Sequence, residues 1–145
     1  MTGEEPGRVL ALDVGSVRVG AAISDPMRRI AQPLAVWPVV DKGGGWRRKF
    51  EAALAQYRPT LVLAGLPVRT DGTRGPECGK IEKLLDLLRG EHPELAFETW
   101  DERFTTVIAH QAMIEGGVSR RGRRDRVDRI AAVLILENWL ENSVQ

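Results

Sequence analysis

The sequence has a single cysteine, Cys78, and only two histidines, His92 and His110. One cysteine excludes an internal disulfide and a cysteine-based metal site, and the two histidines are too few for a histidine-rich one, which argues against zinc. No apolar run approaches the roughly 20 residues of a membrane-spanning helix, and the amino terminus lacks a signal-peptide pattern. We therefore expect a cytoplasmic protein with no membrane partner.

Net charge is also small, at +1 over 145 residues. Positive charge is concentrated at residues 120–129, where six arginines accompany two aspartates, so this stretch carries +4 and the rest of the chain −3. Such a stretch is either a solvated helix face or a surface that meets a polyanion. Its position around Asp128 favours the polyanion surface.

The length and a hydrophobic content of 43% predict one domain over residues 1–145, with residues 1–7 frayed. Short apolar runs at 8–14, 17–24 and 30–37 predict an antiparallel meander of three strands. Pro33 argues that the third strand lies at an edge of the sheet.

The second half of the chain alternates between strand and helix patterns. The expected strands cover 60–66 and 94–100, and the expected helices cover 46–57, 77–89, 104–115 and 125–141, the last one after a loop at 116–122. Alternation of this kind predicts parallel strands joined by helical crossovers. The fold class is therefore α/β, with a five-stranded mixed sheet flanked by helices.

Three acidic positions stand out along this pattern. Asp13 interrupts the apolar run ALDVG, where a charge is costly unless it is paired or bound to metal. Asp101 and Glu102 directly follow the last predicted strand, at a sheet edge where ligands gather. Strand alternation sends these two side chains to opposite faces, so only one reaches a shared site, and we favour Glu102. Asp128 lies at the first turns of the final predicted helix, just before its apolar stretch, and we favour it over Asp125, which is three residues earlier on the same face.

Each acid also has a structural interpretation. Asp13 can pair with an arginine or with a backbone turn, and the other acids can stabilise helix amino termini. If the acids converge instead, they supply the oxygen ligands that Mg²⁺ or Mn²⁺ prefers. One or two such ions can activate water for phosphodiester cleavage. The chain contains no GxSxG elbow, P-loop or GxGxxG motif that would indicate other chemistry.

A loop rich in glycine and threonine, Pro67 to Gly75, follows a continuous apolar strand and contains Arg69 and Arg74. Backbone amides and arginines of such a loop can bind phosphate. An ordinary surface loop is an equally good interpretation of these residues.

Four segments together resemble the signatures of the YqgF/RuvX family in order and spacing, over about residues 8–141. They are ALDVGSVRVGAAISD (11–25), AGLPVRTDGTRG (64–75), DERFTT (101–106) and RVDRIAAVLILENWL (126–140). This family is described as Holliday-junction-resolvase-like and as a nuclease that matures the 5′ end of pre-16S ribosomal RNA. The resemblance implies an RNase H-like fold. Position by position, it implies Asp13, the Asp101-Glu102 pair and Asp128 as the catalytic acids.

We therefore expect a Mg²⁺-dependent endonuclease that acts on structured RNA or branched DNA, with metal held by Asp13, Glu102 and Asp128. The residues expected to position phosphates are Arg18, Arg69, Arg74, Arg103, Arg120, Arg121, Arg123 and Arg124. A homodimer is expected by analogy with RuvC-type resolvases. The alternatives are a Holliday junction resolvase, a non-catalytic nucleic-acid-binding module, and an actin-like ATPase domain, which would need a second such domain.

Overall fold

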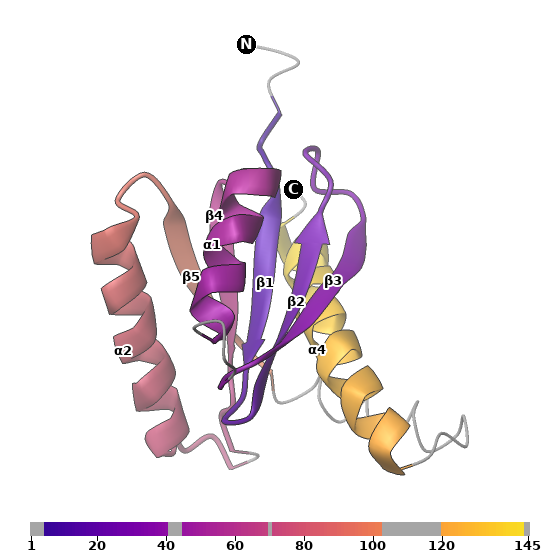
Figure 1. The fold of residues 1–145 in the computed structure, drawn as a ribbon, viewed down its shortest axis with the longest axis vertical. Helices are drawn as coiled ribbons and strands as arrows, with labels where there is room; N and C mark the ends of the chain where they lie inside the picture. Colours follow the sequence, from indigo (N-terminus) through magenta and orange to yellow (C-terminus); the bar gives the residue numbers. More distant parts are fainter. Residues whose placement is uncertain (1–4, 41–44, 70, 103–119, 144–145) are drawn as a thin grey trace.

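The computed structural model describes residues 5–40, 45–69, 71–102 and 120–143, with the side chains of 120–129 outside the description. Within these ranges the chain forms five strands and three helices (Figure 1). In chain order they are β1 (Val9–Val14), β2 (Arg18–Ser24), β3 (Ala31–Pro38), α1 (Trp46–Tyr57), β4 (Leu61–Leu66), α2 (Pro76–Glu91), β5 (Ala96–Asp101) and α4 (Arg120–Ser143).

The strands form one mixed sheet in the order β3-β2-β1-β4-β5. β1 pairs with β2, and β2 with β3, in antiparallel fashion, whereas β1–β4 and β4–β5 are parallel. The predicted α/β class, with a three-stranded meander and two parallel strands, is confirmed. Pro33 lies in the edge strand β3, as predicted, where a residue without a backbone N–H is tolerated.

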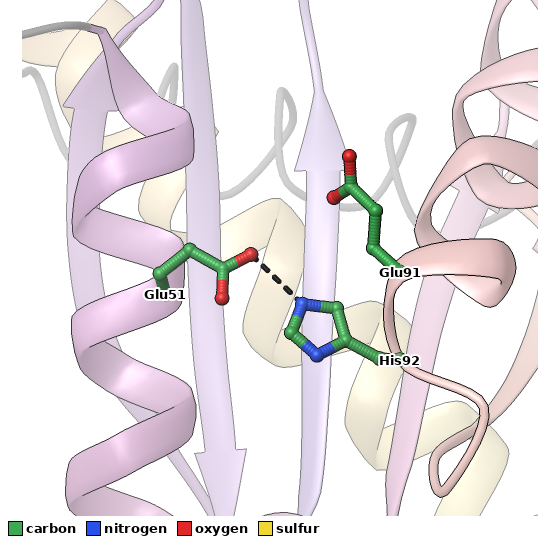
Figure 2. Close-up of side chains that lie close together, drawn as sticks. All are labelled: Glu51, Glu91 and His92. Carbon is green, nitrogen blue, oxygen red and sulfur yellow. Dashed lines mark hydrogen bonds and ion pairs between the residues drawn. The ribbon is translucent and has the colours of Figure 1, made fainter.

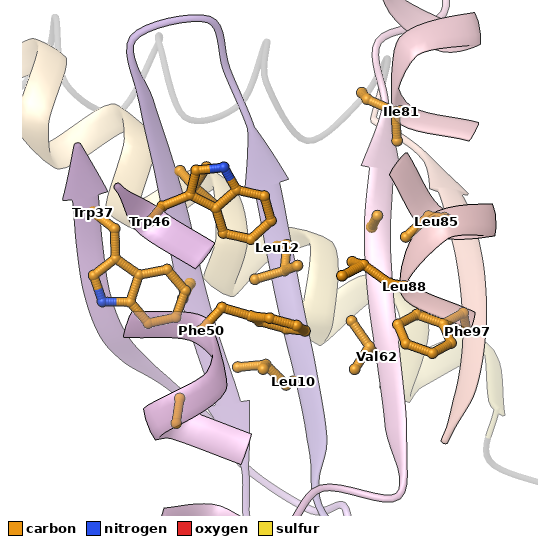
Figure 3. Packing of buried hydrophobic residues seen from close by; sticks show 14 of the residues in the cluster. Leu10, Leu12, Trp37, Trp46, Phe50, Val62, Ile81, Leu85, Leu88 and Phe97 are labelled. Atoms are coloured by element: carbon orange, nitrogen blue, oxygen red, sulfur yellow. The ribbon is translucent and has the colours of Figure 1, made fainter. Parts of the chain in front are cut away.

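Helices cover both faces of the sheet (Figure 1). On one face, α1 and α2 pack against alternate residues of β1 and β4, with Leu12, Phe50 and Leu85 among the fully or almost fully buried side chains (Figure 3). On the other face, Ala11 and Leu63 pack against α4. Because strand residues alternate between faces, odd-numbered positions of β1 and β4 point toward α4.

Several element boundaries differ from the sequence predictions. α4 includes residues 120–122, which belong to the loop predicted at 116–122, because arginines favour helix and a single internal Gly122 costs only about 1 kcal/mol. Ile130 and Leu134 of α4 are half-buried, and its buried residues are Ala131, Ala132, Ile135, Leu136, Trp139 and Leu140. The predicted helix at 104–115 lies outside the described residues.

Pro6 and Gly7, near the start of the described chain, form hydrogen bonds with the rest of the fold. The Gly7 N–H donates to the Pro26 carbonyl at 2.9 Å, and the Arg28 guanidinium donates to the carbonyls of Pro6 and Gly7. The same guanidinium lies 5.5 Å from the ring centre of Trp139 on α4. Residues 1–4 lie outside the description.

Candidate active site

The strands that carry the candidate acids end at one edge of the sheet. β1, β4 and β5 are parallel, so their carboxyl ends lie together (Figure 1). Leu12 pairs with Ala64, so the next row of the ladder places Asp13 beside Gly65. Gly65 in turn pairs with Trp100 on β5, and Glu102 follows two residues later. The hairpin after Asp13 is closed by the Gly15 N–H, which donates to the Arg18 carbonyl at 3.0 Å.

Asp13 and Glu102 lie on the face of the sheet that α4 covers. Asp13 follows Val9 and Ala11 in the alternation of β1, and both of these pack against α4. On β5, Glu98 accepts a hydrogen bond from the Trp139 indole N–H at 3.1 Å, and Trp100 packs against the α4 cluster. Glu102 continues this alternation.

Asp101 has the opposite orientation along β5. Its partner in the ladder is Leu66, which belongs to the cluster beneath α1 and α2. Paired residues of neighbouring strands share a face of the sheet. Of the acidic pair, therefore, only Glu102 lies on the same face as Asp13.

Glu102 is one of two buried polar or charged residues of the described chain, with a relative exposure of 8%. Its N–H donates to the Leu66 carbonyl at 3.1 Å, which continues the β4–β5 ladder beyond the end of β5. Its carboxylate lies above Gly65, since a methyl group at Gly65 would be 2.8 Å from Glu102 Oε2. The same methyl would be 2.7 Å from Ile135 Cδ1, so the carboxylate also lies beside α4.

Asp128 belongs to α4, and its side chain lies outside the description. α4 runs antiparallel to β5, because Ile135 lies near Glu102 whereas Trp139 lies at Glu98. Asp128 precedes Ile135 by seven residues, about 10 Å along a helix axis. The backbone at Asp128 therefore lies farther along α4 than Ile135, toward the edge where β1, β4 and β5 end.

The arginines predicted to bind phosphate lie on different elements and differ in exposure. Arg18 begins β2 and is half-buried, whereas Arg69 is exposed in the loop after β4. Arg74 is exposed and forms an ion pair with Glu82 at 3.3 Å. Arg103 lies outside the described residues, and Arg120, Arg121, Arg123 and Arg124 are described only by their backbone in α4.

The loop after β4 is internally bonded within its described residues. The Arg69 N–H donates to the Thr73 carbonyl at 2.9 Å, and the Gly72 N–H donates to the Arg69 carbonyl at 2.8 Å. The Asp71 carboxylate accepts from the hydroxyl and the N–H of Thr73, and these hydrogen bonds hold the pKa of Asp71 below its usual value. These contacts hold Arg69 and Thr73 in a compact turn next to the carboxyl end of β4.

A second group of potential ligands, which the sequence analysis missed, lies between α1 and α2. Glu51, Glu91 and His92 offer ligand atoms within 4.8 Å of one another (Figure 2). Only the neighbours Glu91 and His92 give a signal in the sequence, since Glu51 comes from another helix. His92 follows the last residue of α2, so this group is remote from the edge that holds Asp13 and Glu102.

Existing contacts make this second group an ion-pair network rather than a metal site. Arg47 forms an ion pair with Glu91. His92 Nε2 lies 2.8 Å from Glu51 Oε2, and its Nδ1 lies 3.5 Å from Glu94 Oε1. Both ring nitrogens face carboxylates, which favours the protonated imidazolium, and a cation at this point would be repelled by it and by Arg47.

This network predicts a pH dependence of stability. The hydrogen bond with Glu51, foremost, raises the pKa of His92 above its usual 6.5. The stabilisation is complete below pH 6.5 and is lost as pH rises through the higher pKa of the folded state. Because Glu51 is half-exposed, we expect a loss of about 0.5–1 kcal/mol in the free energy of unfolding. Urea unfolding between pH 5 and 9 measures it.

Two variants isolate the His92 contribution to that pH profile. His92→Gln should flatten the decrease of stability above pH 6.5. Glu51→Gln should make this decrease smaller, because the pKa of His92 in the folded state moves toward its usual value. A wild-type slope in both variants would show that another group titrates.

The sequence of this chain matches a protein family and several named relatives over most of its length. The family model described as "RuvX: Holliday junction resolvase" matches residues 7–142. A relative from Clostridium tetani, named "Putative pre-16S rRNA nuclease", is 39% identical over 135 residues, which cover 93% of this chain and 96% of the relative. A relative of the same name from Roseiflexus sp. is 37% identical over 140 residues, covering 95% and 96%.

Two solved structures have a similar fold at low sequence identity. T. thermophilus RuvC in complex with a Holliday junction substrate superposes with a TM-score of 0.52 at 15% identity, covering 94% of this chain and 96% of that one. The yeast mitochondrial Holliday junction resolvase Ydc2 gives 0.53 at 12% identity, covering 94% and 78%. The predicted RNase H-like fold is thereby confirmed. Among the helices of the described residues, none has the length and apolarity that crossing a membrane requires.

Proposed function

Since this chain belongs to the RuvX family, described as Holliday junction resolvase, we propose that it is a nuclease that hydrolyses phosphodiester bonds. We propose precursor 16S ribosomal RNA as its substrate. Two relatives named "Putative pre-16S rRNA nuclease" are 37–39% identical to this chain over more than 90% of both chains. Branched DNA is the second candidate, favoured by the description of the family. The cytoplasmic location and the homodimer stay predictions.

One observation carries the proposed chemistry: Asp13 and the buried Glu102 share one face at the carboxyl edge of the parallel strands. Ligands gather at such edges in α/β sheets. We propose that these two carboxylates, with Asp128 from α4, hold Mg²⁺ or Mn²⁺. Carboxylate oxygens are the ligands that both ions prefer. A bound ion would supply Lewis-acid activation of water and of the scissile phosphate.

The protein's own contribution is to orient and to shield. The β1–β4–β5 ladder fixes the backbones of Asp13 and Glu102 on one rigid sheet, which orients the acids better than loops would. α4 covers this face of the sheet and excludes water beside Glu102 through Ile135, which is fully buried. The low exposure of the Glu102 carboxylate strengthens its electrostatic interaction with a bound cation.

The direct test is a cleavage assay on wild-type protein. A precursor 16S ribosomal RNA fragment and a four-way DNA junction are incubated with Mg²⁺, Mn²⁺ or EDTA. We expect the RNA to be cut with either metal ion and to stay intact in EDTA. Cleavage of the junction alone would favour the resolvase alternative. Binding of both substrates without cleavage would contradict the enzyme proposal in favour of a binding module.

The arginine-rich start of α4 predicts a salt dependence of binding. Replacing Arg120, Arg121, Arg123 and Arg124 with alanine should weaken binding to the RNA and flatten the plot of log affinity against log salt. If each of the four contacts one phosphate, the slope falls by about 3. Binding titrations at several salt concentrations measure this slope.

Arg89→Ala is the matched control for this experiment. Arg89 lies on α2, across the sheet from α4, and forms an exposed ion pair with Asp86 at 2.7 Å. Its loss removes one positive charge and should leave the slope unchanged. If the quadruple variant kept the wild-type slope, the start of α4 would not be the phosphate-binding surface.

A further inference from the structure

We infer that Gly65 is a positioning residue of the site, because its missing side chain leaves the space that the Glu102 carboxylate occupies above β4. This inference rests on the proposed nuclease function. It adds a residue that carries no chemistry of its own and that acts through Glu102. The inference is based on the position of the Glu102 carboxylate, which lies over β4, the strand between β1 and β5.

Strand spacing makes this space necessary. Asp13 lies on β1 and Glu102 follows β5, with β4 between them. Neighbouring strands are about 4.8 Å apart, so the two backbones are separated by about 10 Å. Two carboxylates that share one Mg²⁺ each place an oxygen about 2 Å from the ion. The longer glutamate side chain must therefore reach back across β4, and Gly65 is the β4 residue beside Asp13.

Contacts at Gly65 show how tightly this space is filled. A methyl group there would lie 2.8 Å from Glu102 Oε2, 3.2 Å from Glu102 Cδ and 2.7 Å from Ile135 Cδ1. Glu102 and Ile135 are both buried, so neither side chain lies free in solvent. Both contacts involve the far ends of side chains, so the fold can adapt to a methyl group by moving the Glu102 carboxylate and the Ile135 side chain.

Backbone conformation does not explain the glycine. Gly65 is absent from the described glycines with positive φ, which are Gly7, Gly45 and Gly72. Glycine in the interior of a strand weakens it, since it has no side chain to pack. A buried glycine therefore destabilises β4. The close approach of Glu102 and Ile135, which leaves no room for a side chain, explains its presence there.

The test compares Gly65→Ala with two other variants. Gly65→Ala should fold but lose cleavage on the order of a hundredfold, since a misplacement of about 1 Å has that effect. It should also weaken Mn²⁺ binding, measured by titration calorimetry without nucleic acid. Gly79→Ala is the matched control, because a methyl group at Gly79 meets nothing within 4 Å. It should keep wild-type cleavage and Mn²⁺ affinity.

A double variant separates the catalytic role from a packing role. Ile135→Val removes Cδ1, so Gly65→Ala/Ile135→Val relieves the contact with Ile135 but not the one with Glu102. We expect it to regain thermal stability relative to Gly65→Ala while cleavage and Mn²⁺ affinity stay low. Recovery of both cleavage and Mn²⁺ affinity in the double variant would show that Gly65 has only a packing role.

Failure of this inference differs from failure of the proposed function. Gly65→Ala with wild-type cleavage and Mn²⁺ affinity would overturn the inference and leave the nuclease proposal standing. A wild-type protein that cuts neither substrate would contradict the nuclease proposal. Mn²⁺ titration would still test Gly65 in that case, because unchanged affinity in Gly65→Ala would overturn the inference without reference to cleavage.

Discussion

Asp13→Asn is expected to reduce cleavage by about a thousandfold while leaving nucleic-acid binding close to that of the wild type. The substitution keeps the shape of the side chain and removes the charge that we propose as a metal ligand. Loss of Lewis-acid stabilisation is worth several kcal/mol, and about 4 kcal/mol corresponds to a thousandfold. Single-turnover cleavage and a binding titration, both with the precursor RNA, measure the two quantities.

Asp86→Asn is the control for that substitution. Asp86 is exposed on α2 and its ion pair with Arg89 lies on the opposite side of the sheet from α4. Its cleavage rate should equal that of the wild type. If Asp13→Asn cut at the wild-type rate, Asp13 would be a structural aspartate, paired within the fold.

Glu102→Gln and Asp101→Asn should have very different effects, although the two residues are adjacent. Glu102 lies on the face of Asp13, whereas Asp101 pairs with Leu66 on the other face. We expect Glu102→Gln to lower cleavage at least about a hundredfold, as a displaced ligand does. Asp101→Asn should stay within about threefold, in the range of a substitution outside the metal centre.

The same single-turnover assay compares these two variants, with thermal melting as the check on folding. Glu102→Gln should melt near the wild-type temperature or above it, because a neutral amide is less costly to bury than a carboxylate. A large loss of cleavage in Asp101→Asn with little loss in Glu102→Gln would place the metal centre on the α1/α2 side. That result would contradict the proposed site.

Much of this architecture was predictable because hydrophobic period and turn chemistry are local signals. The continuous apolar run at residues 60–66 predicted a strand, and β4 is buried at every position, as is typical of a central parallel strand. The proline in β3 predicted an edge strand for the same kind of local reason. The start of α4 was not predictable in this way, since a glycine among arginines resembles a loop.

The sequence was sufficient to name the candidate acids of the site, but not to decide between Asp101 and Glu102. Alternation showed that one of Asp101 and Glu102 could share a face with Asp13, but not which one. The choice depends on the register of β1 with β4 and of β4 with β5, and on the face that α4 covers. These are contacts between segments far apart in the chain.

Two further features were invisible in the sequence for the same reason. The role of Gly65 depends on Glu102 and Ile135, which lie 37 and 70 residues later. The network of Arg47, Glu51, Glu91 and His92 joins α1 to the end of α2, two helices that cover the same face of the sheet. Neither has a spacing that a motif would describe.

Anomalous diffraction from crystals of the protein grown with Mn²⁺ tests the central claim most directly. The account predicts a Mn²⁺ peak at the carboxyl edge of β1 and β5, with oxygens of Asp13 and Glu102 in its coordination sphere. A peak confined to Glu51, Glu91 and His92, or density at the edge that touches neither Asp13 nor Glu102, would contradict it.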